Sequence, residues 1–152
     1  MTRWTENEVL AALRLAVPTG NGEAVNGGYG AVGTDTRSLV SGSLFVALRG
    51  ENFDGHAFLG AAAEKGAKGA IVETVPAGAP PMRYYTVPDT LGALTRLARH
   101  RRRSLTAKVV AITGTNGKTT TKEMARAILS TRYATHATTG NLNNLIGAPL
   151  TL

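Results

Sequence analysis

Apolar residues recur along the first part of the chain in two patterns, one typical of helices and one typical of buried strands. A threonine followed three residues later by a glutamate forms a capping box, which predicts a first helix over residues 6–16. The apolar run 43–48, bounded by glycines, has the length of a strand covered on both faces. An alanine-rich stretch predicts a helix over 56–65, and a strand over 70–72 follows. These elements form one strand–helix–strand unit.

The same alternation continues toward the C-terminus. A strand is expected over 83–87, and Asp89 then caps a helix with one apolar stripe. A second strand–helix succession follows, with a strand over 108–113, a glycine turn, a helix over 118–130 and a short strand over 133–137. The pattern predicts the α/β fold class.

The chain divides near residues 104–107, where an arginine run ends and a new strand is expected. Residues 1–106 are predicted to form a small N-terminal α/β domain. Residues 107–152 are predicted to be the start of a second, nucleotide-binding domain: its first strand, phosphate loop and helix. A complete α/β nucleotide-binding domain needs more strands than about 45 residues supply, so we expect this second domain to be incomplete.

Composition narrows the protein class. Of the 152 residues, 43% are hydrophobic and 18% are charged, which favours a packed globular protein over a disordered one. No apolar run approaches the roughly 20 residues of a membrane-spanning helix. The acidic residues Glu6 and Glu8 stand where an export signal would be apolar, and the chain contains no cysteine, so we expect a cytoplasmic protein without disulfides or thiolate-bound metals.

The net charge of +7 raises the alternative of a nucleic-acid-binding module. Residues 96–132 carry ten basic side chains and one acidic one, so this segment accounts for the whole excess. Nucleic-acid binding through such a segment favours interleaved aromatic residues, and none lies between Tyr85 and Tyr133. The cluster 100–103 is better explained as a solvated helix end, where cations interact favourably with the helix dipole. We therefore expect no nucleic acid as a partner.

The strongest chemical signal lies between the predicted strand 108–113 and the helix that follows it. The residues of this loop are Gly114, Thr115, Asn116, Gly117, Lys118, Thr119 and Thr120. A glycine turn that opens a helix directs backbone N–H groups and the positive helix end toward one anion. Lys118 would neutralise phosphate charge, and the hydroxyl of Thr119 would bind Mg²⁺. The loop departs from the strict phosphate-loop pattern Gly-x-x-x-x-Gly-Lys-Ser/Thr, because Ile112 stands where that pattern has its first glycine. An isolated Gly-Lys-Thr is often a plain turn, but the flanking strand and helix favour phosphate binding.

Two other stretches are ambiguous when each is considered alone. The first contains Asp-Thr-Arg at 35–37 and Gly-Glu-Asn-Phe-Asp-Gly-His at 50–56. There, Arg37 and Asp54 would commonly form a surface ion pair, and His56 would commonly begin a helix. The second is the tail 139–152, whose asparagines are typical of a turn.

Taken together, the three stretches resemble the Mur ligases of peptidoglycan precursor synthesis. The resemblance extends from Asp35 to Leu152. It rests on Asp-Thr-Arg at 35–37 followed by three longer stretches: Ser-Leu-Phe-Val-Ala-Leu-Arg-Gly-Glu-Asn-Phe-Asp-Gly-His, Ala-Ile-Thr-Gly-Thr-Asn-Gly-Lys-Thr-Thr-Thr-Lys-Glu-Met and Gly-Asn-Leu-Asn-Asn-Leu-Ile-Gly-Ala-Pro-Leu-Thr-Leu. Mur ligases use the shorter form of the phosphate loop, so Ile112 is no departure within this family. The resemblance implies that the second domain, residues 107–152, would be the start of the central domain of such a ligase.

The resemblance implies site residues and ligands. ATP phosphates would bind at residues 114–120, with Mg²⁺ on Thr119. The UDP portion of the substrate would lie near Thr36, Arg37, Asn52, Phe53 and Asp54. The asparagines Asn141, Asn143 and Asn144 would approach the substrate between the two domains.

The resemblance also implies a reaction. The substrates would be UDP-N-acetylmuramoyl-tripeptide and D-alanyl-D-alanine, joined through an acyl phosphate made from ATP. The preceding ligase of the family, which adds the third amino acid, is an alternative that the asparagine-rich tail disfavours. We expect a monomer that does not insert into membranes. We also expect this chain alone to lack catalysis, since the family's acidic magnesium ligand and C-terminal domain are not in the sequence.

Overall fold

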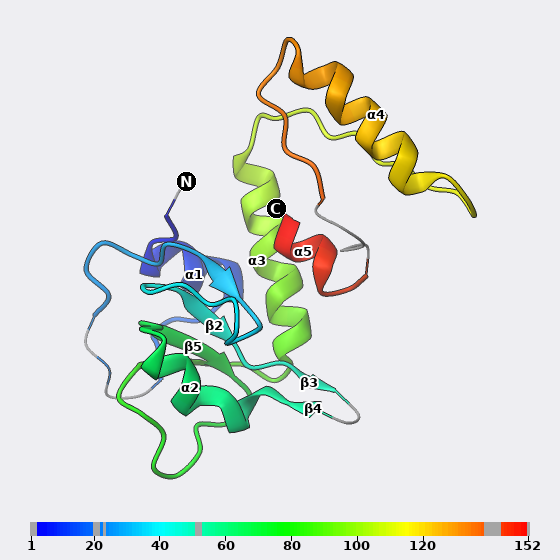
Figure 1. Ribbon diagram of the computed structural model, residues 1–152. Helices are drawn as coiled ribbons and strands as arrows, with labels where there is room; N and C mark the ends of the chain where they lie inside the picture. Colours follow the sequence, from blue (N-terminus) through cyan, green and yellow to red (C-terminus); the bar gives the residue numbers. More distant parts are fainter. Residues whose placement is uncertain (1–2, 20–21, 23, 51–52, 139–143, 152) are drawn as a thin grey trace.

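The computed structural model describes residues 3–19, 22, 24–50, 53–138 and 144–151. In chain order (Figure 1) the elements are α1 (Glu6–Leu13), β1 (Val32–Gly33), β2 (Leu44–Val46), β3 (Arg49–Gly50), β4 (Phe53–Asp54), the 3₁₀ helix η1 (Gly55–Phe58), α2 (Leu59–Glu64), β5 (Gly69–Val72), β6 (Arg83–Thr86), α3 (Thr90–Ser104), α4 (Lys118–Ser130) and α5 (Gly147–Thr151). Strands and helices are mixed along the chain, and the predicted α/β class is confirmed.

A parallel sheet forms the centre of the first hundred residues. Its strand order is β1-β2-β5-β6, and all three pairings are parallel. The connection from β2 to β5 runs through η1 and α2, which is the predicted strand–helix–strand unit. A separate antiparallel pair, β3 and β4, follows β2 and precedes η1. This hairpin lies where β2 ends, at one margin of the sheet (Figure 1).

Helices cover both faces of the sheet. Successive residues of a strand point to opposite sides, so the apolar strands present two apolar faces on which helices pack. Leu44, Val46 and Ile71 pack in a cluster with residues of α1 and α3. Phe45, Ala70 and Val72 pack with α2 in a second cluster. All six side chains are buried, as the continuous apolar runs of β2 and β5 predict.

The predicted helix starts at residue 6 and after Asp89 are confirmed, but the first helix is shorter than expected, and the helix predicted over 56–65 is divided into the 3₁₀ helix η1 and the α-helix α2 (Leu59–Glu64). The Thr5 Oγ1 accepts from the Glu8 N–H at 3.2 Å, and the Glu8 carboxylate accepts from the Thr5 N–H at 2.7 Å. Asp89 likewise caps α3 by accepting from the Leu91 N–H at 2.9 Å. The first helix ends at Leu13 rather than at residue 16, because Arg14 adopts the left-handed conformation with φ of 60°.

Two predicted strands are wrong. Residues 108–113 and 133–137 are irregular, although α4 between them has its predicted bounds. A strand requires a neighbour for its backbone hydrogen bonds, and the described part of the chain offers none to these segments, which lie apart from the sheet beside α4 (Figure 1). Val109 and Val110 consequently remain 59% and 69% exposed. None of the side chains of α4 is buried.

The basic end of α3 was predicted to be solvated, and the structure shows that this is only partly so. Arg101 is 7% exposed, and its guanidinium carbon lies 4.1 Å from the centre of the Trp4 ring. This contact is a cation–π interaction between α3 and the segment that precedes α1. Arg103, by contrast, is exposed as expected.

The tail forms one more element than the sequence analysis expects. Residues 147–151 make the short helix α5, which packs on α3 (Figure 1). Among the described residues, no helix combines the length and hydropathy that crossing a membrane demands.

Candidate functional site

The glycine loop before α4 has the backbone geometry of an anion site. Gly117 precedes the helix with φ of 77°, and Gly114 has φ of 148°, conformations that side-chain-bearing residues rarely adopt. No side chain of a described residue caps α4 at its start. The first N–H groups of the helix therefore have no intrahelical acceptor and are available to a bound anion.

Lys118 folds back over this loop. Its Nζ donates to the carbonyl oxygen of Gly114 at 2.5 Å and lies 3.4 Å from that of Thr115. The ammonium is thereby held at the loop rather than extended into solvent. A phosphate seated on the loop would meet both this positive charge and the helix N-terminus.

The loop by itself gives little support for a metal site. Thr115, Asn116, Thr119 and Thr120 are all exposed, so the Thr119 hydroxyl is accessible. Within the described ranges, no group of three or more histidine, cysteine, aspartate or glutamate side chains could hold a metal ion. Thr119 can thus supply one oxygen ligand for Mg²⁺, and further ligands must come from elsewhere, such as ATP phosphates or water.

A cavity of about 670 Å³ lies at the margin of the sheet beside the β3–β4 hairpin. Three of the predicted substrate residues line it: Thr36, Arg37 and Phe53. Ile146, from the tail before α5, lines the same cavity. Its remaining lining residues are Thr34, Asp35, Phe45, Leu48, Arg49, Gly50 and Phe58. The cavity therefore joins the N-terminal sheet region to the C-terminal tail.

Arg37 lies at the cavity in a two-pronged ion pair. Its Nη2 is 2.6 Å from Asp35 Oδ2, and its Nε donates to Asp35 Oδ1 at 3.0 Å. The hydrogen bonds from the Arg37 side chain and N–H lower the pKa of Asp35 to about 2. The Arg37 side chain is 89% exposed, so it can turn toward a ligand at little cost.

Asp54 is not bonded to Arg37, contrary to the ion pair that the sequence suggests. Its Oδ2 instead accepts from Arg49 Nη2 at 2.8 Å, and its Oδ1 lies 2.6 Å from His56 Nδ1. Arg37 and Asp54 thus each form an ion pair with a residue nearby in the sequence, Asp35 and Arg49 respectively. The backbone N–H of His56, followed by Arg49 and the His56 ring, holds the pKa of Asp54 well below its ordinary range.

Two phenylalanines form an exposed aromatic surface in the cavity. The rings of Phe53 and Phe58 are stacked with centroids 5.4 Å apart and planes at 18°. They are 50% and 41% exposed, which is unusual for large apolar side chains in contact. Such a pair provides a flat apolar surface for a planar group.

Several predicted residues cannot be placed at the cavity. Asn52, Asn141 and Asn143 lie outside the described residues. Asn144 is described, and its Oδ1 accepts from the N–H of Ile146 at 3.1 Å and of Gly147 at 2.7 Å. Its observed contacts therefore begin α5 and fix the backbone of Ile146.

Sequence reasoning missed some of the cavity residues. Arg49 and Phe58 flank the Asn-Phe-Asp-Gly-His stretch, and their nearness in the chain to predicted residues was the available signal. Ile146 stands two residues after the predicted Asn144, so the same signal was available for it, and the structure adds that α5, which follows Ile146, packs on α3.

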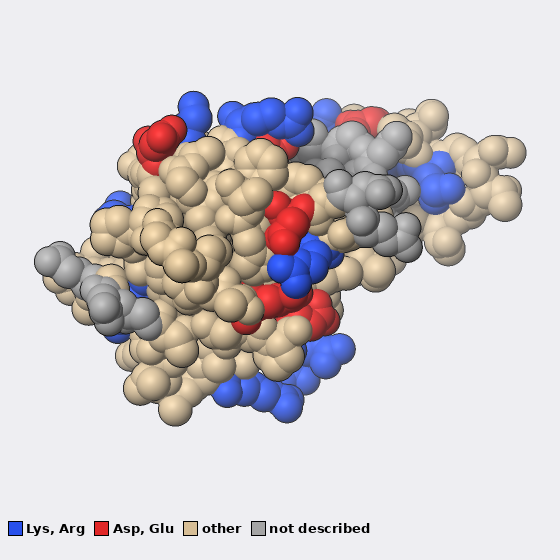
Figure 2. Space-filling model, turned by 90° about the horizontal axis from the view of Figure 1, so that it is seen from below, with Lys and Arg blue, Asp and Glu red and all other residues tan. Residues whose placement is uncertain are grey.

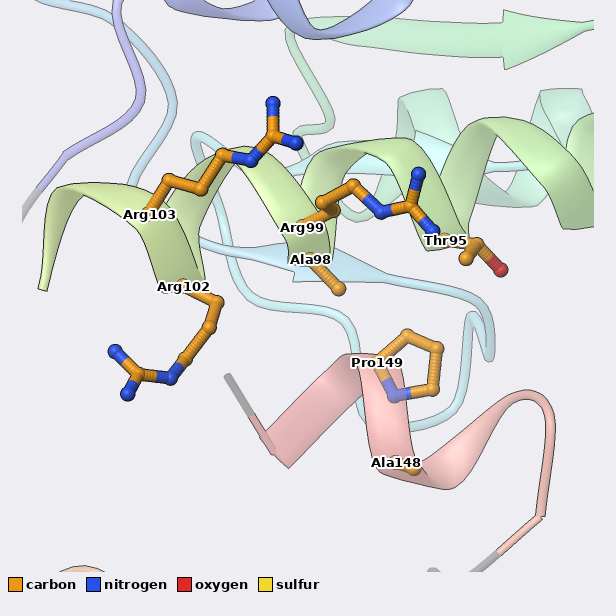
Figure 3. A pocket seen from close by; sticks show the side chains of 7 residues that line it. All are labelled: Thr95, Ala98, Arg99, Arg102, Arg103, Ala148 and Pro149. Atoms are coloured by element: carbon orange, nitrogen blue, oxygen red, sulfur yellow. The ribbon is translucent and has the colours of Figure 1, made fainter. Parts of the chain in front are cut away.

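A second, shallower groove of about 480 Å³ lies between α3 and α5. Arg99, Arg102 and Arg103 line it, but their guanidinium groups point in different directions (Figure 3). One of them, Arg102, donates to the Leu105 carbonyl oxygen at 3.0 Å. The three arginines do not converge on a common point, so this groove lacks the geometry of a discrete anion site.

Comparison with known proteins gives a consistent result. The family model described as "Mur ligase family, catalytic domain" matches residues 29–102, and the model of the Mur ligase middle domain matches residues 112–152. A UDP-N-acetylmuramoyl-tripeptide–D-alanyl-D-alanine ligase of Bacillus subtilis is 46% identical over 122 residues, covering 80% of this chain and 27% of the relative.

Solved structures are also similar over most of the chain. A crystal structure of MurF from Acinetobacter baumannii has a TM-score of 0.86 at 37% identity, covering 99% of this chain and 32% of that one. MurF from Thermotoga maritima in complex with ADP has a TM-score of 0.68 at 32% identity, covering 80% and 28%. The chain thus spans about a quarter of the curated relative and about a third of the solved ones.

Proposed function

Because the chain belongs to the Mur ligase family, we propose that it forms part of a ligase that joins D-alanyl-D-alanine to UDP-N-acetylmuramoyl-tripeptide. In this proposal residues 1–106 bind the UDP substrate and residues 107–152 begin the ATP-binding domain. One observation carries it: a single cavity gathers Thr36, Arg37 and Phe53 with Ile146 from the tail. The names of the similar proteins support the choice of this ligase over the preceding one of the family.

The cavity suits the nucleotide end of such a substrate. The stacked pair of Phe53 and Phe58 offers a surface for a pyrimidine base. The nearby guanidinium of Arg37 offers N–H donors to the oxygens of the ribose or diphosphate. Asp54 acts on this site by holding Arg49, and Asn52, Asn141 and Asn143 are proposed to contact the substrate next to it. Asn144 positions Ile146 in the cavity wall by accepting a hydrogen bond from its backbone N–H.

The glycine loop is proposed to bind ATP. Free N–H groups at the start of α4 and the ammonium of Lys118 fit the phosphates, and the ADP complex of the Thermotoga maritima protein supports nucleotide use. Magnesium, held in part by Thr119, would offset phosphate charge during phosphoryl transfer.

The chemistry of the whole ligase follows from the reactivity of carboxylates. A carboxylate oxygen of the tripeptide attacks the γ-phosphorus of ATP, releasing ADP and giving an acyl phosphate. The amine of D-alanyl-D-alanine then attacks the acyl carbon and gives up a proton, phosphate leaves with the electron pair of the broken C–O bond, and an amide remains. Loop residues 114–120 contribute by orienting the phosphates and stabilising their charge. We propose that the whole ligase is a monomer and that it catalyses this reaction in the cytoplasm.

Nucleic acid is the rival ligand from another class. On the face shown in Figure 2, acidic and basic side chains lie next to one another and form no continuous basic surface. The guanidinium of Arg101, in the arginine cluster, lies over the Trp4 ring in a cation–π contact. These features favour the substrate cavity over a nucleic-acid surface.

Calorimetric titration of the chain with UDP-N-acetylmuramoyl-tripeptide tests the proposal. We expect saturable binding that Phe53→Ala weakens by about tenfold or more, since stacking on a base contributes roughly 1–3 kcal/mol. Tyr133→Ala is the matched control, because Tyr133 is 61% exposed and lines neither cavity. Absence of binding, together with salt-dependent binding to random duplex DNA, would favour the rival.

A further inference from the structure

We propose that His56 is a positioning residue of the substrate cavity. In one fixed tautomer it holds Asp54, and through Asp54 it holds Arg49, whose remaining N–H groups donate to an acceptor oxygen of the bound ligand. The proposal rests on the function proposed above, because the ligand is taken to be the UDP portion of the substrate.

The contacts of His56 determine which ring nitrogen carries the proton. The ring is buried, with 8% of the residue exposed. The backbone N–H of Glu73, just after β5, donates to Nε2 at 2.9 Å, so Nε2 carries a lone pair rather than a proton. The proton of the neutral ring therefore resides on Nδ1, which donates to Asp54 Oδ1 at 2.6 Å.

The carboxylate of Asp54 is held at both oxygens. Oδ1 accepts from the His56 ring and also from the His56 backbone N–H at 3.0 Å. Oδ2 accepts from Arg49 Nε at 3.1 Å and from Arg49 Nη2 at 2.8 Å. A carboxylate bound in this way on one side presents a fixed acceptor to the guanidinium on its other side.

Arg49 completes a closed ring of contacts. Its Nη1 donates to Glu73 Oε2 at 3.2 Å, so Glu73 binds His56 through its backbone and Arg49 through its side chain. Three of the five guanidinium N–H groups are thus used by described residues. The remaining two are free of these contacts, the side chain is 53% exposed, and Arg49 lines the cavity.

The ring of contacts has a mechanical consequence for the hairpin. Strands β3 and β4 are exposed along their length, so no apolar core fixes them. The contacts among Arg49, Asp54, His56 and Glu73 join the hairpin to the end of the buried strand β5. Loss of the His56–Asp54 bond would leave Arg49 and Phe53 less well oriented in the cavity wall.

Two substitutions distinguish the roles of the two ring nitrogens of His56, because each keeps the hydrogen bond of one nitrogen and removes that of the other. In His56→Asn the amide nitrogen takes the place of Nδ1 and still donates to Asp54, while the bond to Glu73 is lost. In His56→Gln the amide oxygen takes the place of Nε2 and still accepts from Glu73, while the bond to Asp54 is lost. Each variant removes one part-buried hydrogen bond of the ring, so thermal unfolding should be affected similarly in both.

The readout is the affinity of the chain for UDP, measured by calorimetry. We expect His56→Gln to bind UDP about tenfold more weakly than His56→Asn, because only the former loses the bond to the charged acceptor. Arg49→Gln should weaken UDP binding to a similar extent, whereas Arg132→Gln, on an exposed residue outside the cavity, is the matched control. Uridine as a second probe locates the acceptor oxygen. If Arg49→Gln lowers the affinity for both uridine and UDP, the oxygen belongs to the nucleoside. If it lowers the affinity for UDP alone, the oxygen belongs to the diphosphate.

Equal UDP affinities of the two His56 variants, or an Arg49→Gln affinity equal to that of Arg132→Gln, would overturn the inference. Failure of the unaltered chain to bind UDP would instead count against the proposed function of the cavity. The Arg49→Gln comparison keeps the test decisive if a His56 variant does not fold, since Arg49 lies in an exposed strand.

Discussion

At the scale of single residues, two buried tyrosines that lie far apart in the sequence are paired through their hydroxyl groups. The hydroxyls of Tyr29 and Tyr85 are 2.7 Å apart, and both residues are completely buried. Burial raises the pKa of Tyr85 to about 12 and that of Tyr29 still further. Both phenols must therefore stay protonated in the folded protein, with one donating to the other.

The tyrosine pair predicts a specific loss of stability in alkali. Above the ordinary phenol pKa of about 10, the unfolded chain releases protons that the folded chain retains, so the free energy of unfolding falls as pH rises. Urea unfolding at pH values of roughly 9, 10.5 and 11.5 should show this fall, and a Tyr29→Phe/Tyr85→Phe double variant should show less of it. Identical pH dependence in the two proteins would contradict the assignment.

At the scale of elements, local signals predict most of the helix starts, whereas tertiary partners decide the strands. The capping box at Thr5 and the cap at Asp89 are correct because each depends on residues within three positions. The strand expected over 108–113 is absent because its apolar residues carry no information about whether a neighbouring strand is present. Thr36, Arg37 and Phe53 were found from their motifs, whereas in the tail the motif pointed to the asparagines and the structure places the neighbouring Ile146 at the cavity.

The capping box allows a stability prediction for α1. Thr5→Ala removes the side-chain acceptor of the Glu8 N–H and should lower the free energy of unfolding by about 1 kcal/mol. Fluorescence of Trp4, the sole tryptophan, reports this transition, because the residue is buried beside α1. Thr131→Ala, at the exposed end of α4, is the control that should leave the same transition unchanged. Equal losses in both variants would argue against a role for the cap.

At the scale of the whole molecule, the chain combines a packed sheet region with a second region that stays open. The sheet is covered by α1 and α3 on one face and by α2 on the other (Figure 1). In the second region, Met124 and Ile128 of α4 are 61% and 69% exposed. The tail nevertheless returns to the first region, where α5 packs on α3 and Ile146 reaches the cavity. Substrate binding and the placement of the second region are therefore expected to be coupled.

The open second region predicts that nucleotide chemistry is absent from this chain alone. We expect ATP hydrolysis and amide formation by the 152-residue chain to be no higher than in a Lys118→Ala variant. The physical reason is that the glycine loop is exposed, and among the described residues no acidic cluster is available to hold Mg²⁺ beside it. Release of phosphate from ATP is the measurement, and turnover that depends on Lys118 would show that the loop is already catalytically competent.

We propose that one cavity, lined by residues of the segments 34–50 and 53–58 and by Ile146 of the tail, receives the UDP end of the substrate. Backbone amide resonances of the chain, followed during titration with UDP-N-acetylmuramoyl-tripeptide, test it most directly. Saturable shifts with one common dissociation constant are expected at Thr36, Arg37, Phe53 and Ile146. Shifts confined to the arginines of α3, with the cavity residues unchanged, would contradict it.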